Sequence, residues 1–316
     1  MIDGILIGQY ERIGDGWLTG TTVVLCPAGA VGGVDSRGGA PGTRETDLLD
    51  PRNLVDRVHA VMLTGGSAYG LAAATGVMEW LEQHGIGWPI GTRGEVVPIV
   101  PGAVLYDLSR GGDFGNRPTA EFGWAACAAA TADPVRLGNA GAGAGAKAGG
   151  FKGGLGFSSV RTRSGVTVEV VAAINAIGSI VDRRTGRLYS DVAGSLDSPT
   201  QAELADFPVP SRTPLNTTIA VVSTDAALTK AQCQRLAGSA QDGLAIAVRP
   251  AHLMSDGDTV FALSTGAIPI ADSEHFDEVL SAAASAFVEA VYHGILAAQS
   301  SHSLRSYRDA CPSVFR

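Results

Sequence analysis

Apolar residues in this 316-residue chain gather in short runs that glycine-rich and polar segments separate. Several runs are rich in β-branched residues and are bounded by turn residues, which is the pattern of buried β-strands. The predicted strands are residues 19–26, 60–63, 166–175, 218–223 and 260–263.

Other segments repeat apolar residues every three or four positions, which predicts helices. Leu71, Ala74, Met78 and Leu81 form one such series, and Gly85 ends it. Further helices are expected in the alanine-rich segment 119–131, after a Thr229–Gln232 capping box, and over residues 276–296. Alternating strands and helices indicate an α/β fold.

Four connecting segments are polar or rich in glycine. Residues 32–47 predict a long loop, and such loops in compact domains tend to be functional. Residues 138–154 lack the Gly-Lys-Ser/Thr of a phosphate loop, so a tightly turned loop that lines a pocket and carries Lys147 and Lys152 is favoured. Residues 183–214 predict a surface connection, and the chain from Ser300 onward looks loose.

Composition and charge exclude several classes of protein. The net charge of −8 without a basic cluster argues against a nucleic-acid partner. The four cysteines lie far apart and the histidines are dispersed, so neither a metal site nor any other cofactor is expected. The N-terminus lacks a signal-peptide pattern and no apolar run reaches membrane-spanning length, so we expect a cytoplasmic protein without membrane contact.

Residues 64–70, between a strand and a helix, resemble a serine-hydrolase turn, but Tyr69 stands where that motif needs glycine. We therefore interpret the glycines as letting the start of the helix pack tightly. We also expect Gly65, Gly66, Ser67 and Tyr69 to contact a substrate, with backbone N–H groups facing a bound anion or carbonyl.

Asn216-Thr217-Thr218 opens a predicted strand and allows two interpretations. A threonine there can be structural, because β-branched residues favour strands. Alternatively, the chain cuts itself between Asn216 and Thr217, and the new N-terminal Thr217 uses its hydroxyl as nucleophile and its own α-amine as base.

Other polar residues also stand at the ends of predicted strands. Asn175 is either a turn residue or an amide donor for an oxyanion. Asp256-Gly257-Asp258 is an ordinary turn sequence, and the other oxygen ligands of a calcium loop are missing.

Four motifs, which follow one another along the chain in the order found in the family, resemble the L-aminopeptidase/D-esterase (DmpA-like) family. This family includes β-peptidyl aminopeptidases and the nylon-oligomer endohydrolase, and ornithine acetyltransferases are distant relatives. The motifs are GAPGTRETD at 39–47, LTGGSAYGL at 63–71, NTTI at 216–219 and DGDT at 256–259.

The resemblance implies a four-layer α/β/β/α sandwich and a single self-processing domain, 1–316, cut into chains 1–216 and 217–316 that stay together in oligomers. It implies Thr217 as nucleophile, Asn175 as the oxyanion or positioning residue, and Asp256 and Asp258 as the pair near the nucleophile. The family's lysine falls at Gly150 here, so either Lys152 or Lys147 replaces it or the lysine role is absent.

The implied function is hydrolysis of amide or ester bonds in aminoacyl or short-peptide substrates by a homo-oligomer, namely a tetramer of cut heterodimers. Two alternatives remain open, an acyltransferase of the ornithine acetyltransferase type and an uncut binding protein. The possible substrates include D- or L-aminoacyl amides, β-aminoacyl peptides and ω-amino-acid oligomers.

Overall fold

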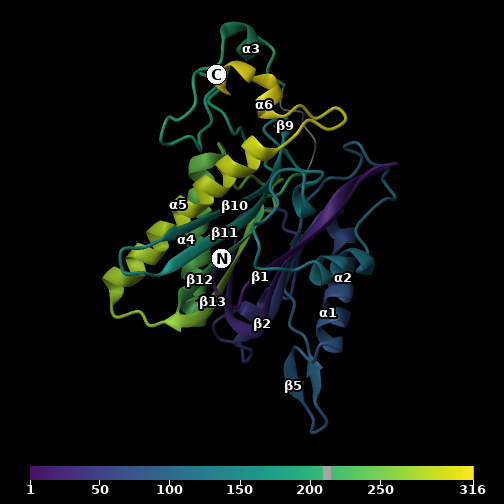
Figure 1. Cartoon of the computed structure of the whole chain (residues 1–316), viewed down its shortest axis with the longest axis vertical. Helices are drawn as coiled ribbons and strands as arrows, with labels where there is room; N and C mark the ends of the chain where they lie inside the picture. The colour runs from purple at the N-terminus through teal and green to yellow at the C-terminus, as the bar shows by residue number, and fades with distance from the viewer. Residues whose placement is uncertain (209–214, 316) are drawn as a thin grey trace.

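The computed structural model describes residues 1–208 and 215–315, and a nine-stranded sheet runs through these residues. Its strand order is β10-β11-β12-β13-β2-β4-β7-β3, with β1 paired to β2 (Figure 1). The strands are β1 (Leu6–Gly14), β2 (Trp17–Ser36), β3 (Thr43–Arg44), β4 (Arg57–Thr64), β7 (Gly102–Val104), β10 (Gly154–Arg161), β11 (Thr167–Ile174), β12 (Ile219–Ala226) and β13 (Thr259–Ile268).

The long strand β2 belongs to two layers of sheet. Its first half pairs with β1 and β4, and its last residues, from Val31 to Ser36, pair with β13. The two layers face each other across one apolar core, in which Leu63 of β4 lies with Val221 of β12 and Phe261 of β13. The sheet therefore folds over into two stacked layers.

Helices cover both outer faces of this pair of layers (Figure 1). Helices α1 (Ala73–Gln83) and α2 (Ala120–Ala128) pack on Val23 and Met62, and α4 (Lys230–Ala247) and α5 (Ser273–Ala297) pack on the β10–β13 half. The predicted α/β/β/α sandwich is confirmed. Both faces of the central strands are buried, which explains why their sequences read as continuous apolar runs.

The helices predicted from periodicity are present, and the capping box of α4 forms as expected, with Thr229 and Gln232 each binding the other's backbone. By length and composition α5 could cross a membrane, but its apolar side chains, among them Val279, Phe287 and Val291, belong to the core against α4 and the sheet. Its hydropathy is that of a core helix.

Small elements complete the fold. They are the hairpin of β5 (Trp88–Ile90) with β6 (Glu95–Val97), the pair β8 (Lys147–Ala148) with β9 (Phe151–Lys152), and the short helices η1 (Asp47–Leu49), η2 (Ser67–Ala72), η3 (Gly141–Gly143), α3 (Gln201–Ala205), α6 (Tyr307–Ala310) and η4 (Pro312–Phe315).

Two predictions about loops were wrong. The segment 32–47 begins as strand, because β2 continues to Ser36. Its Gly33 lies so close to α4 that a Cβ there would stand 2.5 Å from the backbone of Cys233, so the glycine marks a close helix contact rather than a turn.

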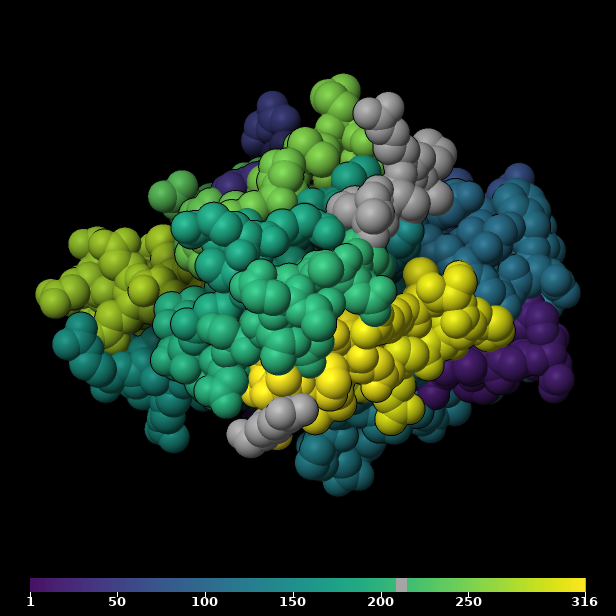
Figure 2. All heavy atoms as spheres, turned by 90° about the horizontal axis from the view of Figure 1, so that it is seen from above, coloured from purple at the N-terminus to yellow at the C-terminus, as the bar shows by residue number. Residues whose placement is uncertain are grey.

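The C-terminal segment is folded rather than loose. Tyr307 is fully buried, its ring packs on Phe151 and its hydroxyl donates to the Gly186 carbonyl at 3.0 Å. Figure 2 shows this segment in yellow against the green residues that lead up to position 208. Of the predicted connection 183–214, residues 183–208 carry α3 and contact the C-terminal segment through Glu203 and Asp206, which accept from Ser313 and Arg305, and residues 209–214 lie outside the described chain.

Candidate active site

The polar residues singled out at strand ends converge on one edge of the sheet. Strand β11 runs antiparallel to β12, and β12 runs parallel to β13, so the end of β11 meets the starts of the other two. Asn175 follows β11, Thr217 precedes β12, and Asp258 precedes β13. The backbone N–H of Thr217 donates to the Asn175 carbonyl at 2.8 Å.

The peptide bond between Asn216 and Thr217 lies in a short stretch of parallel pairing with residues 255–257. The Asn216 N–H donates to the Ser255 carbonyl at 3.2 Å, and the Gly257 N–H donates to the Asn216 carbonyl at 3.1 Å. The Thr217 hydroxyl donates to the same Asn216 carbonyl oxygen, with an Oγ1–O distance of 2.5 Å. The carbonyl that self-cleavage would attack is thus held by two donors.

A hollow of about 270 Å³ opens beside Thr217. It connects the nucleophile candidate to the surface although Thr217 itself is only 5% exposed. Among the described residues, its lining comes from four segments of the chain and carries no charged side chain. The lining residues are Ala40, Pro41, Gly42, Ser67, Ala68, Val104, Tyr106, Leu215 and Thr217.

Of the residues predicted to contact substrate at 64–70, only Ser67 lines this hollow. The Gly65 N–H donates to the Gly20 carbonyl and the Gly66 N–H to the Asp107 carboxylate, so neither donor faces a ligand. Tyr69 is 56% exposed and lies under the Arg117 guanidinium. The expectation of free N–H groups there was wrong because a buried carboxylate, absent from the motif, occupies one of them.

The two aspartates are buried and bind backbone groups. Asp258 accepts from the Thr218 N–H at 2.8 Å with one oxygen and from the His252 N–H at 3.0 Å with the other. Asp256 accepts from the N–H groups of Ile177 and Leu253. Burial, followed by the charge of Asp258, raises the pKa of Asp256 to about 6. The pair therefore fixes the loop that holds the Asn216 carbonyl.

The hydrogen bonds that the structure gives the Asn175 side chain go to groups other than that carbonyl. Its Oδ1 accepts from the Lys147 N–H at 2.9 Å, and its Nδ2 donates to the Tyr106 carbonyl at 3.3 Å. The N–H group on the Asn216 carbonyl comes from Gly257 instead, and a Cβ at position 257 would lie 2.8 Å from Thr217 Oγ1. In the uncut chain Asn175 contacts Thr217 through its main chain.

Lys152 is fully buried and does not line the hollow. Its Nζ donates to the carbonyls of Gly143 and Gly153, and burial, followed by the charge of Arg110, lowers its pKa to about 7. Lys147 is partly buried. Gly150 has a φ of +100°, a conformation in which a lysine would be strained.

The sequence interpretation missed Arg110, which is only 7% exposed. Its guanidinium donates to the side-chain oxygens of Asn175 and Asn216, and at 3.3 Å to the Leu215 carbonyl. Burial lowers its pKa to about 10. Its segment matches no motif, and the one available signal was a lone arginine between an apolar run and Gly111-Gly112.

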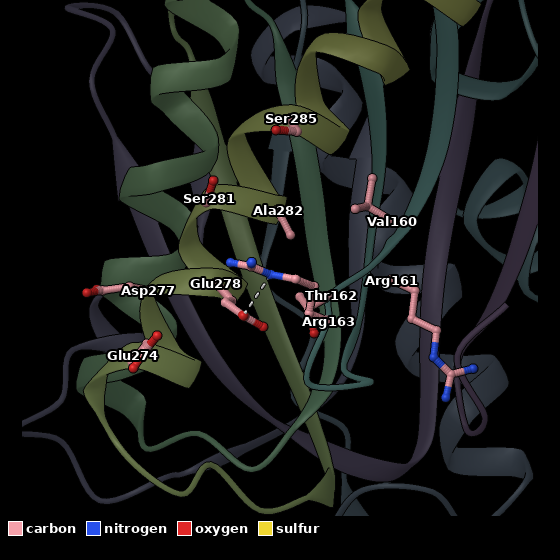
Figure 3. A pocket seen from close by; sticks show the side chains of 10 residues that line it. All are labelled: Val160, Arg161, Thr162, Arg163, Glu274, Asp277, Glu278, Ser281, Ala282 and Ser285. Carbon is pink, nitrogen blue, oxygen red and sulfur yellow. Dashed lines mark ion pairs between the residues drawn. The ribbon is translucent and has the colours of Figure 1, made fainter.

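A roomier hollow, of about 490 Å³, lies far from these residues between the β10–β11 hairpin and the first half of α5 (Figure 3). Charged side chains surround it, and Arg163 pairs with Glu278 across it at 3.4 Å. It contains none of the strand-end residues, so the smaller hollow at Thr217 is the candidate active site.

Solved structures share this architecture. A β-aminopeptidase from Burkholderia sp. superposes with a TM-score of 0.73 at 22% identity, over 99% of this chain and 92% of that one. The L-aminopeptidase D-Ala-esterase/amidase of Ochrobactrum anthropi, described as a variant of the Ntn-hydrolase fold, gives a TM-score of 0.73 at 21% identity, over 96% and 88% of the two chains. The fold is thus that of the N-terminal-nucleophile hydrolases.

Sequence comparison places the chain within that class. Residues 2–307 match the profile of peptidase family S58, and the chain belongs to this family. An uncharacterized aminopeptidase of Mycobacterium tuberculosis is 49% identical over 99% of this chain and 98% of its own. The 6-aminohexanoate-oligomer endohydrolase of Paenarthrobacter ureafaciens is 31% identical over 80% of this chain and 71% of its own. The resemblance drawn from the ordered motifs is confirmed, and the protein is an aminopeptidase or amidohydrolase.

Proposed function

We propose that this aminopeptidase cuts its own chain between Asn216 and Thr217 and then uses Thr217 as an N-terminal nucleophile. The observation that carries the proposal is the contact of the Thr217 hydroxyl with the Asn216 carbonyl oxygen, which also accepts the Gly257 N–H. A structural threonine at a strand start needs neither contact.

In the first reaction Thr217 Oγ1 attacks the Asn216 carbonyl carbon and loses its proton. The negative charge that develops on the carbonyl oxygen is stabilised by the Gly257 N–H. The C–N bond then breaks, the nitrogen takes up a proton and becomes the α-amine of Thr217, and an ester joins Asn216 to Oγ1. Water hydrolyses this ester to leave a carboxyl group on Asn216 and a free Thr217.

In turnover the same hydroxyl attacks the carbonyl of a substrate amide or ester. The α-amine of Thr217 takes the hydroxyl proton and passes it to the leaving group. An α-amine titrates at about pH 7.7–8.0, so a useful fraction is neutral near pH 7. The Asn175 carbonyl, which accepts from this nitrogen in the uncut chain, would hold the new amine in place.

The test is the mass of the purified protein, with activity on an aminoacyl p-nitroanilide measured on the same sample. The wild type should give fragments of 216 and 100 residues. Thr217→Ala should stay at full length and be inactive, and Thr217→Ser should keep part of both reactions because it retains a hydroxyl.

Thr218→Val is the matched control, because it removes a buried hydroxyl that has no partner among the described residues. It should be cut and active. An active wild-type protein that runs as one uncut chain would refute the proposal. Transfer of the acyl group to an added amine rather than to water would indicate the acyltransferase alternative. An uncut, inactive wild type would indicate a binding protein.

The substrates we propose are aminoacyl amides or esters and short peptides. Family membership supports this choice, and so does the hollow at Thr217, whose described lining residues carry no charge. We further propose that cut pairs assemble into a homo-oligomer, a tetramer of cut heterodimers, and that the enzyme acts in the cytoplasm. Size-exclusion chromatography with light scattering measures the number of chains in the oligomer, and cell fractionation measures the location of the enzyme.

A further inference from the structure

The chain's own Asn216 occupies the acyl position of the first reaction that the site would perform. This inference rests on the proposed function, because only a nucleophilic Thr217 makes Asn216 an acyl group. The surroundings of Asn216 then describe the place where the acyl part of a later substrate must lie, since the same hydroxyl attacks both carbonyls.

The main chain of Asn216 makes the contacts that a substrate would need. Its N–H donates to the Ser255 carbonyl at 3.2 Å, and its carbonyl accepts from the Gly257 N–H at 3.1 Å. An aminoacyl substrate can repeat both, with its α-ammonium on Ser255 and its reacting carbonyl on Gly257. This is the way in which an extended peptide adds to the edge of a strand.

The side chain of Asn216 lies in a polar site. Its Oδ1 accepts from the Arg110 guanidinium, and its Nδ2 lies 3.5 Å from the Lys147 carbonyl. Asn175 holds Arg110 from the other side, and the Tyr106 ring lies under the guanidinium at 5.4 Å. Arg110 is therefore fixed in place independently of Asn216.

The charge around this site favours an oxygen-bearing group. Arg110 is buried, and its Nε has no partner among the described residues. Burial, followed by the charge of Arg110, lowers the pKa of both Lys147 and Lys152, and the charge of Asp107 opposes the larger effect of burial on the pKa of Arg110. A carboxamide or carboxylate oxygen suits such a site, whereas an ammonium group would be repelled.

We propose that the site that holds the Asn216 side chain is the acyl side-chain subsite of the mature enzyme, and that Arg110 makes it select acyl groups with a carboxamide or carboxylate at Cγ. The substrate class is then asparaginyl and aspartyl amides with a free α-amine. After cleavage the end of the first fragment must leave this subsite before such a substrate enters.

The first experiment compares p-nitroanilides of Asn, Asp, Leu and Lys on the cut wild-type enzyme. Leucine has nearly the shape of asparagine without its hydrogen-bonding atoms, so it isolates the effect of the polar contacts. A hydrogen bond to a charged group predicts kcat/KM for Asn and Asp at least about tenfold above that for Leu, with Lys lowest. Leu hydrolysed as well as Asn by the cut enzyme would overturn the subsite while leaving the proposed function intact.

The second experiment uses self-cleavage, which needs no added substrate. Asn216→Leu should slow the cut at least about tenfold, and Asn216→Asp should keep most of the rate, because only the latter retains an oxygen for Arg110. Equal rates for Asn216→Leu and the wild type would refute the inference even if every p-nitroanilide were inert.

Arg110→Lys keeps the charge and loses the planar fork, so it should narrow the preference for Asn over Leu through KM more than through kcat. Arg117→Lys, which alters an arginine that lies over Tyr69, is the matched control and should leave the preference unchanged. An undiminished preference in Arg110→Lys would show that Arg110 does not read the acyl side chain. A wild type that is never cut would instead refute the proposed function on which the inference depends.

Discussion

The carboxylate of Asp258 joins two segments that must be in register for the Asn216–Thr217 bond to be held. One oxygen fixes the Thr218 N–H at 2.8 Å, and the other lies 3.0 Å from both the N–H and the Nδ1 of His252. Asp258 therefore positions the residue that follows the nucleophile, and it does so before any cut.

Asp258→Asn should slow both self-cleavage and turnover by at least about tenfold, because its amide group would place a donor against the His252 N–H. The measurement is a time course of cleavage on a gel together with a rate on the same preparation. Asp225→Asn is the control, since Asp225 accepts the Thr167 N–H at the far end of β12. Full cleavage and full activity in Asp258→Asn would reduce Asp258 to a turn residue.

Asp256 should make stability depend on pH. Its pKa in the folded chain is about 6, above the ordinary value of 3.8, so the folded state holds a proton that the unfolded state has released between these values. The free energy of unfolding contributed by this group is therefore fully present below about pH 4 and is lost as the pH rises through about 6.

In the uncut Thr217→Ala background, the advantage of Asp256 over Asp256→Asn should fall by about 1–3 kcal/mol between pH 4 and pH 7. Urea unfolding of both proteins at the two pH values measures this change. A constant difference would show that Asp256 titrates at its ordinary value.

At this scale the sequence predicted the residues that stand at strand ends, namely Asn175, Thr217, Asp256 and Asp258, and the structure brings them together. It did not predict Arg110 or Asp107, because a single buried charge in an irregular segment has no period and no motif. Their roles arise from contacts with residues more than 40 positions away, such as Gly66 and Asn175.

At the scale of elements, glycines let helix α5 lie directly on the edge strand β10. A Cβ at Gly156 would stand 1.8 Å from the Ala290 carbonyl oxygen of α5, and one at Gly294 would stand 2.9 Å from the Gly156 nitrogen. The helix and the strand therefore touch backbone to backbone.

Gly156→Ala should lower the free energy of unfolding by about 1–3 kcal/mol or more, because the added methyl group must push α5 away from the sheet. Gly115→Ala is the control, since its Cβ would meet nothing within 4 Å. Urea unfolding in the Thr217→Ala background measures both variants. Equal stability of Gly156→Ala and Gly115→Ala would show that α5 accommodates the added methyl group without loss of stability.

Strands and helices with a clear period were predicted well, but the C-terminal segment was not. The chain from Ser300 onward was predicted to be loose, whereas Tyr307, Cys311 and Val314 recur at helical spacing and are all buried. The segment is too short for its period to stand out, and its partners, among them Phe151 and Gly186, lie far away in sequence.

At the scale of the whole molecule, the two proposed fragments are interleaved rather than adjacent. Strand β12 of the second fragment pairs with β11 of the first, and β13 of the second pairs with β2 of the first. The C-terminal segment adds contacts, with Ser313 donating its N–H to Glu203 at 2.9 Å and Arg305 paired with Asp206.

Fragments 1–216 and 217–316 should therefore co-elute from a size-exclusion column in native buffer and separate only on a denaturing gel. Removing the second fragment would take β12 and β13 from the middle of the sheet. This would expose a large apolar surface, both in the core between the two sheet layers and in the core under α4 and α5. A 100-residue fragment eluting alone would contradict this arrangement.

The short pairing between Asn216 and residues 255–257 also sets when the enzyme can come into being. Under the proposed self-cleavage, Ser255 and Gly257 must already hold the Asn216 peptide before the bond breaks. A nascent chain on the ribosome has made the scissile bond about 40 residues before it has made these partners, and a misfolded chain never brings them together. Self-cleavage would thus depend on correct folding, and only molecules that have already reached the native structure would become active peptidases.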